Sequence, residues 1–262
     1  MNYTGSLLIM ILVGAIFGYL SGSVLWAVHI SKWMAHKDVR DFESGNPGFT
    51  NTTRVFGKKI GFIVLLLDVL KAVIPTTVMF VVYWCALKPY MDPHITDYYN
   101  PAIYIYVAGV FAVIGHLFPI YYKFKGGKGI ASLGGLLLAI SPFLGATAGL
   151  IIILCVLTTR YVSLGSIIAV LVSPFLVLVP GINYTYFMYP DIVVQVHTTI
   201  NHIVIFLPIC GMLLILGILI VVKHKDNIKR LLNHTERKFN FKKRTSLLNK
   251  EENFKKDHHD KK

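Results

Sequence analysis

The sequence predicts an all-α membrane protein with about seven transmembrane or partly re-entrant helices. Of its 262 residues, 55% are hydrophobic and 15% are charged, a ratio that a soluble domain of this size does not need. The 26 Lys and Arg residues outnumber the 13 Asp and Glu residues. Because these charges avoid the long apolar runs and collect in a few segments, they indicate cytoplasmic loops and no nucleic-acid partner.

Four apolar runs are long enough to cross about 30 Å of hydrocarbon, which takes roughly 20 helical residues. They are Ser6–Ile30, Ile60–Leu87, Ala102–Tyr121 and His202–Val222. We expect the first run to remain as a helix, because no positive charge precedes it and no small-residue cleavage pattern follows it.

A further apolar stretch, Ala131–Pro180, is predicted to hold the remaining three helices. Pro142 interrupts it, and a proline inside a helix removes a backbone hydrogen bond. We therefore expect two short or re-entrant helices up to Leu157, followed by a full span from Val162 to Pro180.

The distribution of Lys and Arg predicts the orientation of these helices. Six lie between Lys32 and Lys59, three between Lys123 and Lys128, and fourteen from Lys223 to the C-terminus. Cytoplasmic loops are richer in Lys and Arg than outer loops. We therefore expect these three segments and the C-terminus in the cytoplasm, and the N-terminus outside.

The same pattern divides the chain into three parts. Residues 1–222 are the predicted membrane-embedded domain, and residues 223–241 are a cytoplasmic basic segment that can form an interfacial helix. Residues 242–262 are a basic tail that we expect to be disordered and attracted to anionic membrane lipid.

The first candidate site is the loop before Arg54. Two glycines and a proline between residues 45 and 48 force a turn, and Thr50 or Asn51 can cap a helix that follows. The free N–H groups at a helix N-terminus bind anions, and Arg54 adds a charge that can hold phosphate at two points. The predicted phosphate cradle comprises Ser44, Gly45, Asn46, Thr50, Asn51 and Arg54.

The second candidate site is a glycine-rich segment at the end of the third run. Gly126, Gly127 and Gly129 let backbone N–H groups approach a ligand closely, while Lys128 supplies a mobile positive charge. The segment is not a P-loop, because Gly-Lys-Gly stands where Gly-Lys-Ser/Thr is required. The sequence therefore predicts phosphate binding without a nucleotide.

The third candidate site begins at the cytoplasmic end of the last run. On a helix His224 and Asn227 are three residues apart and share a face, so both can turn toward the two loops. The alternative is that the Lys and Arg residues around them are ordinary positive-inside anchors.

Three polar residues inside the apolar runs are expected to have structural roles. Asp68 and Lys71 are three residues apart and can form an ion pair facing the bundle, because charges at that depth need a partner. His116 lies near a helix end, where we expect a structural hydrogen bond. Cys85, Cys155 and Cys210 show no paired spacing, so neither a disulfide framework nor a metal site is predicted.

Four elements in order resemble the motifs of a known family. They are Ser44–Arg54, Gly115–Gly129, Arg160–Leu164 and His224–Glu236. The chain up to about Lys238 is similar to the bacterial membrane acyltransferases that use acyl-phosphate to acylate glycerol 3-phosphate. This resemblance implies seven helices in the bacterial cell membrane, with the active site at the cytoplasmic face.

The resemblance also implies a reaction and its residues. An acyl group would pass from acyl-phosphate to the 1-hydroxyl of glycerol 3-phosphate, giving lysophosphatidic acid and phosphate without a cofactor. A monomer is compatible with this, and the oligomeric state stays open. The implied catalytic residues are Ser44, Arg54, Lys128, His224 and Asn227, and the implied phosphate-binding residues are Gly45, Asn46, Thr50, Asn51, Gly126, Gly127 and Gly129.

Three positions depart from the family pattern. Pro47 and Phe49 stand where the family usually has an aliphatic residue and alanine, and Asn233 stands where it usually has glycine. None of these changes removes a charged group. Pro47 lacks an N–H, so the cradle loses one contact if that amide normally touches phosphate.

Three alternatives remain open from the sequence. The base that removes the hydroxyl proton is either His224 or, as we favour, a phosphate of glycerol 3-phosphate. A transporter or channel for a phosphorylated metabolite would also present glycines and cations to an anion. His36 and Asp41 have the spacing of a catalytic dyad in unrelated coenzyme-A-dependent acyltransferases, which we interpret as accidental.

Overall fold

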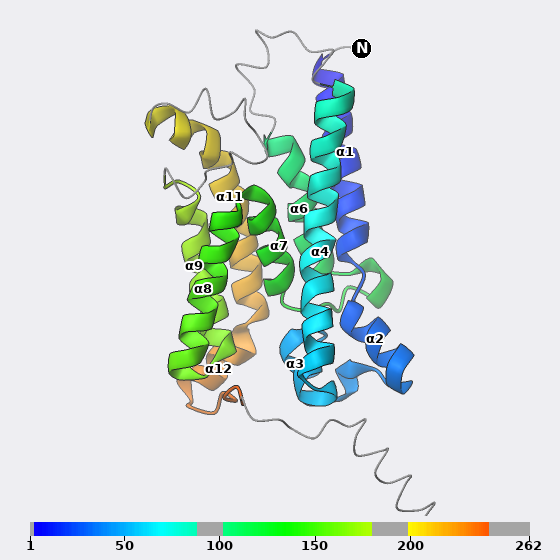
Figure 1. The fold of residues 1–262 in the computed structure, drawn as a ribbon, viewed down its shortest axis with the longest axis vertical. Helices are drawn as coiled ribbons and strands as arrows, with labels where there is room; N and C mark the ends of the chain where they lie inside the picture. The colour runs from blue at the N-terminus through cyan, green and yellow to red at the C-terminus, as the bar shows by residue number, and fades with distance from the viewer. Residues whose placement is uncertain (1–2, 88–101, 180–198, 241–262) are drawn as a thin grey trace, which may run out of the picture.

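The computed structural model describes residues 3–87, 102–179 and 199–240, and the regular secondary structure of these residues is helical (Figure 1). The prediction of an all-α fold is confirmed for this part of the chain. Its helices are α1 (Tyr3–Gly22), α2 (Trp26–Ala35), α3 (Phe49–Phe56), α4 (Lys58–Val82), α6 (Ala102–Leu117), α7 (Ile130–Ile140), α8 (Pro142–Thr159), α9 (Val162–Leu176), α11 (Thr199–Lys223) and α12 (Lys225–Leu232), with the short turns η1 (Val39–Asp41), η2 (Tyr83–Leu87) and η4 (Ile120–Tyr122).

Four segments of the described residues are long and apolar enough to cross a membrane. They are Gly5–Ala35, Lys58–Ala86, Ile105–Tyr122 and Pro142–Thr159. Helices α11 and α12 make a fifth if this pair, bent by 61°, counts as one span. The shorter helices α7 and α9 have 11 and 15 residues. The predicted total of seven crossings, and the side on which each terminus lies, stay predictions.

The first predicted run is divided into α1 and α2 at residues 23–25. The Ser23 hydroxyl donates to the Tyr19 carbonyl over 2.8 Å, a local bond that competes with the helical pattern. The side chain of Leu25, the residue before α2, is fully buried at this break.

The break predicted at Pro142 is present, but the helices on either side differ from the prediction. Ser141 caps α8, and Pro142 occupies its first turn, where a missing N–H costs nothing. Helix α7 is short, as predicted, whereas α8 has 18 residues and can cross alone. Helix α9 ends at Leu176 instead of Pro180, since the amides of Leu178 and Val179 donate to carbonyls three residues back instead of four. Pro180 lies outside the described residues.

Helices α2, α3 and α12 lie at the end of the bundle opposite the N-terminus (Figure 1). The basic segment after α11 is less helical than predicted, because α12 ends at Leu232 and residues 235–240 have no regular secondary structure. His234 adopts a positive φ of 54°, and the amides of Thr235 and Glu236 both donate to the Arg230 carbonyl. The predicted tail, residues 242–262, lies outside the described residues.

Short helix α7 occupies the centre of the bundle, with Leu136 and Leu137 almost fully buried. It contacts α4 closely, because Gly135 lies directly against the Val69 carbonyl and leaves no room for a Cβ. Small residues also let α1 approach α6, where Gly18 and Gly22 lie against the backbone of α6. This packing fixes α7 and the glycine-rich segment that precedes it.

The predicted Asp68–Lys71 pair is present and faces the interior, with 1% and 4% of the two residues exposed. The Lys71 ammonium lies 2.9 Å from Asp68 Oδ1 and donates to the Val24 carbonyl over 2.9 Å. It also lies 2.6 Å from His116 Nδ1, so the structural role expected for His116 is confirmed. These contacts tie α4 to the break after α1 and to the end of α6.

Breaking this pair is expected to destabilise the fold. Lys71→Met leaves a buried carboxylate without its cation, a change that costs about 3–5 kcal/mol in typical proteins. Asp68→Leu combined with Lys71→Met removes both charges and should recover part of that loss. The measurement is the melting temperature of each purified variant in detergent; a double variant less stable than Lys71→Met would contradict this account.

Candidate active site

The three segments singled out in the sequence line one cavity of about 1000 Å³. The loop before α3, the glycine-rich segment before α7 and the start of α12 form its polar mouth. All of the predicted catalytic and phosphate-binding residues border it: Ser44, Gly45, Asn46, Thr50, Asn51, Arg54, Gly126, Gly127, Lys128, Gly129, His224 and Asn227. His36 and Asp41 do not border this cavity.

Asn51 organises the first loop through four hydrogen bonds. Its Oδ1 accepts from the Ser44 amide and hydroxyl, both over 3.0 Å. Its Nδ2 donates to the carbonyls of Val39 and Phe42 over 3.0 and 3.1 Å. The side chains of Ser44 and Asn51, both predicted to belong to the phosphate cradle, are therefore bonded within the loop, and Asn51 holds Ser44 at the cavity.

Helix α3 begins earlier than the predicted caps. Its N-cap is Gly48, which has no side chain to occupy the first amides, whereas Thr50 and Asn51 lie inside the first turn. Gly48, Phe49 and Thr50 border the cavity. The N-terminal end of the helix therefore faces the mouth, an arrangement that suits an anion.

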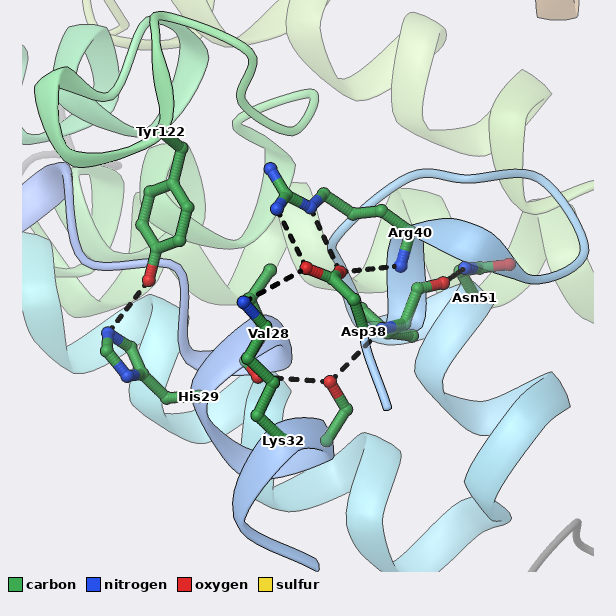
Figure 2. Close-up of polar contacts among 9 residues, drawn as sticks. Val28, His29, Lys32, Asp38, Arg40, Asn51 and Tyr122 are labelled. Carbon is green, nitrogen blue, oxygen red and sulfur yellow. Dashed lines mark hydrogen bonds and ion pairs between the residues drawn. The ribbon is translucent and has the colours of Figure 1, made fainter. Parts of the chain in front are cut away.

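Polar contacts beneath this loop join it to α2 and η4 (Figure 2). Arg40 donates to both carboxylate oxygens of Asp38, from Nε over 3.0 Å and from Nη2 over 2.7 Å. These hydrogen bonds lower the pKa of Asp38. The Arg40 guanidinium lies over the Tyr122 ring, 5.3 Å from its centroid, and the Tyr122 hydroxyl lies 2.8 Å from His29 Nε2. The first loop is thus anchored to the segment that leads into the second.

The second and third segments meet directly. The Lys128 ammonium donates to Asn227 Oδ1 over 2.5 Å, and Asn227 Nδ2 donates to Glu236 Oε1 over 2.8 Å. Glu236 also accepts from Ser163 Oγ over 2.8 Å and from Arg230 Nε over 2.7 Å. Because Asn227 Nδ2 donates to Glu236, the side-chain oxygen of Asn227 is turned toward Lys128.

Sequence reasoning gave no role to Glu236 or Arg230, although both lie within the last motif. Burial favours the neutral form of Glu236, but the hydrogen bonds from Arg230, Ser163 and Asn227 lower its pKa overall. The signal in the sequence was an isolated carboxylate among basic residues, between Arg230 and Arg237.

The residues that follow Glu236 border the cavity mouth. Arg237 forms an ion pair with Glu43, and its carbonyl accepts from Arg54 Nη2 over 3.5 Å. Further along, the Phe239 amide donates to the Arg160 carbonyl over 2.6 Å. This segment therefore connects the first loop to the end of α8.

His224 lies at the bend between α11 and α12 and is 2% exposed. Its Nδ1 lies 2.8 Å from the Ile220 carbonyl, which can only accept, so Nδ1 carries the hydrogen. In the neutral ring Nε2 then keeps its lone pair. His224 can therefore accept a hydrogen bond from a ligand in the cavity.

Packing requires glycine at one position of the second segment, and backbone conformation favours it at another. Gly127 donates its amide hydrogen to the His116 carbonyl over 3.1 Å, and a Cβ at Gly127 would overlap the His116 ring. Gly129 has a φ of 79°, a backbone conformation that favours glycine. The buried Lys71 contacts this histidine from the other side, so the interior cluster supports the loop that carries Lys128.

The mouth is electropositive. Burial, together with the nearby cations Arg230 and Arg54, lowers the pKa of Lys128 to about 8, against the opposing effect of Glu236 and Asp226. A bound anion would relieve this repulsion.

Among residues 3–87, 102–179 and 199–240, no group of three or more His, Cys, Asp and Glu side chains is placed to hold a metal ion.

The cavity continues from this mouth into an apolar arm between α4 and α8, with α7 as its floor. Sequence reasoning did not predict this arm. Its opening faces outward, since Ile153 and Leu157 border it and are 56% and 60% exposed. The apolar arm is lined by Leu65, Val69, Ile130, Leu133, Gly134, Leu137, Leu138, Gly145, Ala148, Gly149, Ile152, Ile153, Val156 and Leu157.

Comparison with known proteins relates this chain to an enzyme family. The family model described as Glycerol-3-phosphate acyltransferase matches residues 12–234. A glycerol-3-phosphate acyltransferase of Ureaplasma urealyticum is 36% identical over 87% of this chain and 90% of the relative. One of Mycoplasma pneumoniae is 38% identical over 91% of this chain and 98% of the relative.

Two crystal structures share the fold. The first is described as PlsY (YgiH), an integral membrane glycerol 3-phosphate acyltransferase, in its glycerol 3-phosphate form. It is 32% identical to this chain, with a TM-score of 0.66, and the match covers 88% of this chain and 96% of that one. The second is the lysophosphatidic acid form of PlsY, also 32% identical, with a TM-score of 0.64 over 88% and 95% of the two chains.

Anion binding at the mouth is expected to weaken as the pH rises through about 8, because Lys128 loses its charge there. Sulfate keeps its charge between about pH 7 and about pH 9, so its Kd should rise by up to about tenfold over that range. Titration calorimetry of the protein in detergent measures this change. Lys128→Arg, whose guanidinium stays protonated, should remove the dependence. A wild-type Kd that is constant over the same range would contradict the role of the Lys128 charge.

Proposed function

Since the chain belongs to the glycerol-3-phosphate acyltransferase family, we propose that its acyl donor is acyl-phosphate. The proposed reaction gives 1-acyl-glycerol 3-phosphate and phosphate, the first step of phospholipid synthesis. The observation that carries this proposal is the continuity of the cavity, in which an electropositive mouth opens into an apolar arm. A substrate with a charged head and a hydrocarbon chain fits both parts.

The mouth suits two phosphate groups held side by side. Arg54, Lys128 and Arg230 come from three separate segments and border the same space, together with the first amides of α3. Cations and oriented amides in a partly desolvated site stabilise developing negative charge strongly. Holding the glycerol hydroxyl next to the acyl carbonyl would add several powers of ten in rate.

The apolar arm suits the acyl chain. Its walls come from α4, α7 and α8, and its outward opening lies on a surface that would face lipid. An acyl-phosphate dissolved in the membrane can enter sideways, with its phosphate reaching the mouth. Glycerol 3-phosphate is water-soluble and would enter from the end of the bundle where α3 and α12 lie, which we propose to be the cytoplasmic side of the bacterial plasma membrane.

The proposed chemistry is a direct acyl transfer. The 1-hydroxyl oxygen of glycerol 3-phosphate forms a bond to the acyl carbon, the bond from that carbon to the phosphate oxygen breaks, and phosphate leaves. Because the acyl group is already activated, no covalent acyl-enzyme is required. Ser44, held by Asn51, and Lys128, held by Asn227, would position the two phosphates.

We assign the hydroxyl proton to a phosphate of glycerol 3-phosphate. His224 could accept a hydrogen bond at Nε2, but its Nδ1 partner is the neutral Ile220 carbonyl. A base that becomes an imidazolium is usually supported by a carboxylate at this position. His224 and Asn227 are therefore assigned as ligands that orient the substrate.

Activity of the purified protein tests the donor. In detergent, with radiolabelled glycerol 3-phosphate and palmitoyl-phosphate, we expect lysophosphatidic acid to form without a sealed compartment, whereas a transporter would form none. Lys128→Ala should lower kcat/KM by about 10²–10³, because it removes charge stabilisation. Lys125→Ala is the matched control, since Lys125 is exposed in the same loop and does not border the cavity. Product from palmitoyl-coenzyme A alone would refute the proposed donor.

His224→Gln separates the two possible bases. If a substrate phosphate takes the proton, the variant should keep nearly full kcat at saturating glycerol 3-phosphate and show a raised KM. Loss of a true general base typically costs about 10²–10⁴ in rate. A kcat reduced to that extent in a correctly folded variant would assign the proton to His224 instead.

A further inference from the structure

Two glycines face the apolar arm without a packing role. Gly134 on α7 and Gly149 on α8 both border the cavity, and a Cβ added to either would meet nothing within 4 Å. Their neighbours on the same helices differ, because Gly135 lies against the Val69 carbonyl and Gly145 lies against the Leu138 side chain. The space in front of Gly134 and Gly149 is therefore space of the arm itself.

Gly149 lies on the face of α8 that borders the arm, between Gly145 and Leu157. The bordering residues of this helix recur every three or four positions, so they form one face of α8. Helix α7 presents a similar face with Gly134 in its middle. A Cβ added at either position would meet no atom within 4 Å, so we expect a side chain there to narrow the arm.

The end of the arm farthest along α8 from Leu157 is formed by Leu138 and Gly145, and Leu138 is itself 38% exposed. These are the last bordering residue of α7 and the first of α8, and the Leu138 side chain lies directly on Gly145. Beyond them Ile140, Ser141 and Leu144 are buried and do not border the cavity. Gly149 lies one turn of α8 before this end, a separation of about 6 Å along the helix.

We propose that Leu138 and Gly149 set the length of the acyl chain that the arm accepts, with Gly134 setting its width. This inference rests on the proposed function, since it takes the acyl group of acyl-phosphate as the occupant. With the phosphate at the mouth, the chain extends along α7 and α8 and its methyl end lies against Leu138. A chain that is too long for the arm must strain the pocket, and one methylene too many in a hydrophobic pocket typically costs about tenfold or more in kcat/KM.

Substitutions at the two positions should shift chain-length preference in opposite directions. Gly149→Leu fills the arm one turn before its end, so the ratio of kcat/KM for palmitoyl-phosphate to that for lauroyl-phosphate should fall by about tenfold or more. Leu138→Ala removes the side chain at this end and relieves the misfit of a longer chain, so the ratio for stearoyl-phosphate over palmitoyl-phosphate should rise by about tenfold. Neither variant should change the KM for glycerol 3-phosphate.

The matched control is Gly211→Leu. Gly211 is a glycine of the apolar helix α11 that also has nothing within 4 Å of an added Cβ, but it does not border the cavity. Its chain-length profile should equal that of the wild type. Melting temperatures in detergent verify that the variants fold, and Gly149→Val replaces Gly149→Leu if the larger side chain prevents folding.

The outcomes separate this inference from the proposed function. If the wild type uses acyl-phosphates and a folded Gly149 variant or Leu138→Ala keeps the wild-type profile, the inference is overturned. If the wild type makes no product from any acyl-phosphate, the proposed function itself fails. Opposite shifts in the two variants, with an unchanged control, support the inference.

Discussion

The hydrogen bond from Lys128 to Asn227 joins two parts of the chain that lie 99 residues apart, and the polar mouth depends on it. An amide side chain can present either its oxygen or its hydrogens, and Glu236 decides which by accepting from Nδ2. The same carboxylate binds Ser163 at the start of α9 and Arg230 on α12. One acidic residue thus organises a site composed mainly of cations.

A second cluster supports the site from inside the membrane domain. Lys71 is held by Asp68 and contacts His116, whose ring leaves room only for a glycine at position 127. The glycine-rich loop is therefore packed against a buried ion pair at one side and joined to α12 at the other. Burial and the neighbouring cations Arg230 and Arg54 lower the pKa of Lys128, and a bound anion would stabilise its charged form.

The sequence was informative where a physical rule acts locally. Hydropathy located the helices, and Pro142 located the break between α7 and α8. The grouping of the candidate site residues was also predicted, because segments rich in Lys and Arg are expected on the same side of a membrane. The helix cap and the role of Asn51 were not predicted, since Gly48 is the N-cap of α3 and Asn51 bonds to the carbonyls of Val39 and Phe42.

Other features required the tertiary structure. Glu236 is one carboxylate in a basic segment, and its contacts with Ser163, Asn227 and Arg230 depend on how α12 ends. The apolar arm is formed by faces of helices that are apolar all round, so periodicity alone cannot distinguish a wall of the arm from a lipid-facing surface. The outward opening at Ile153 and Leu157 has a kinetic consequence: for a donor delivered through the bilayer, turnover would follow its mole fraction among the surrounding lipids, and diluting the membrane with inert lipid would slow the reaction at constant total amount.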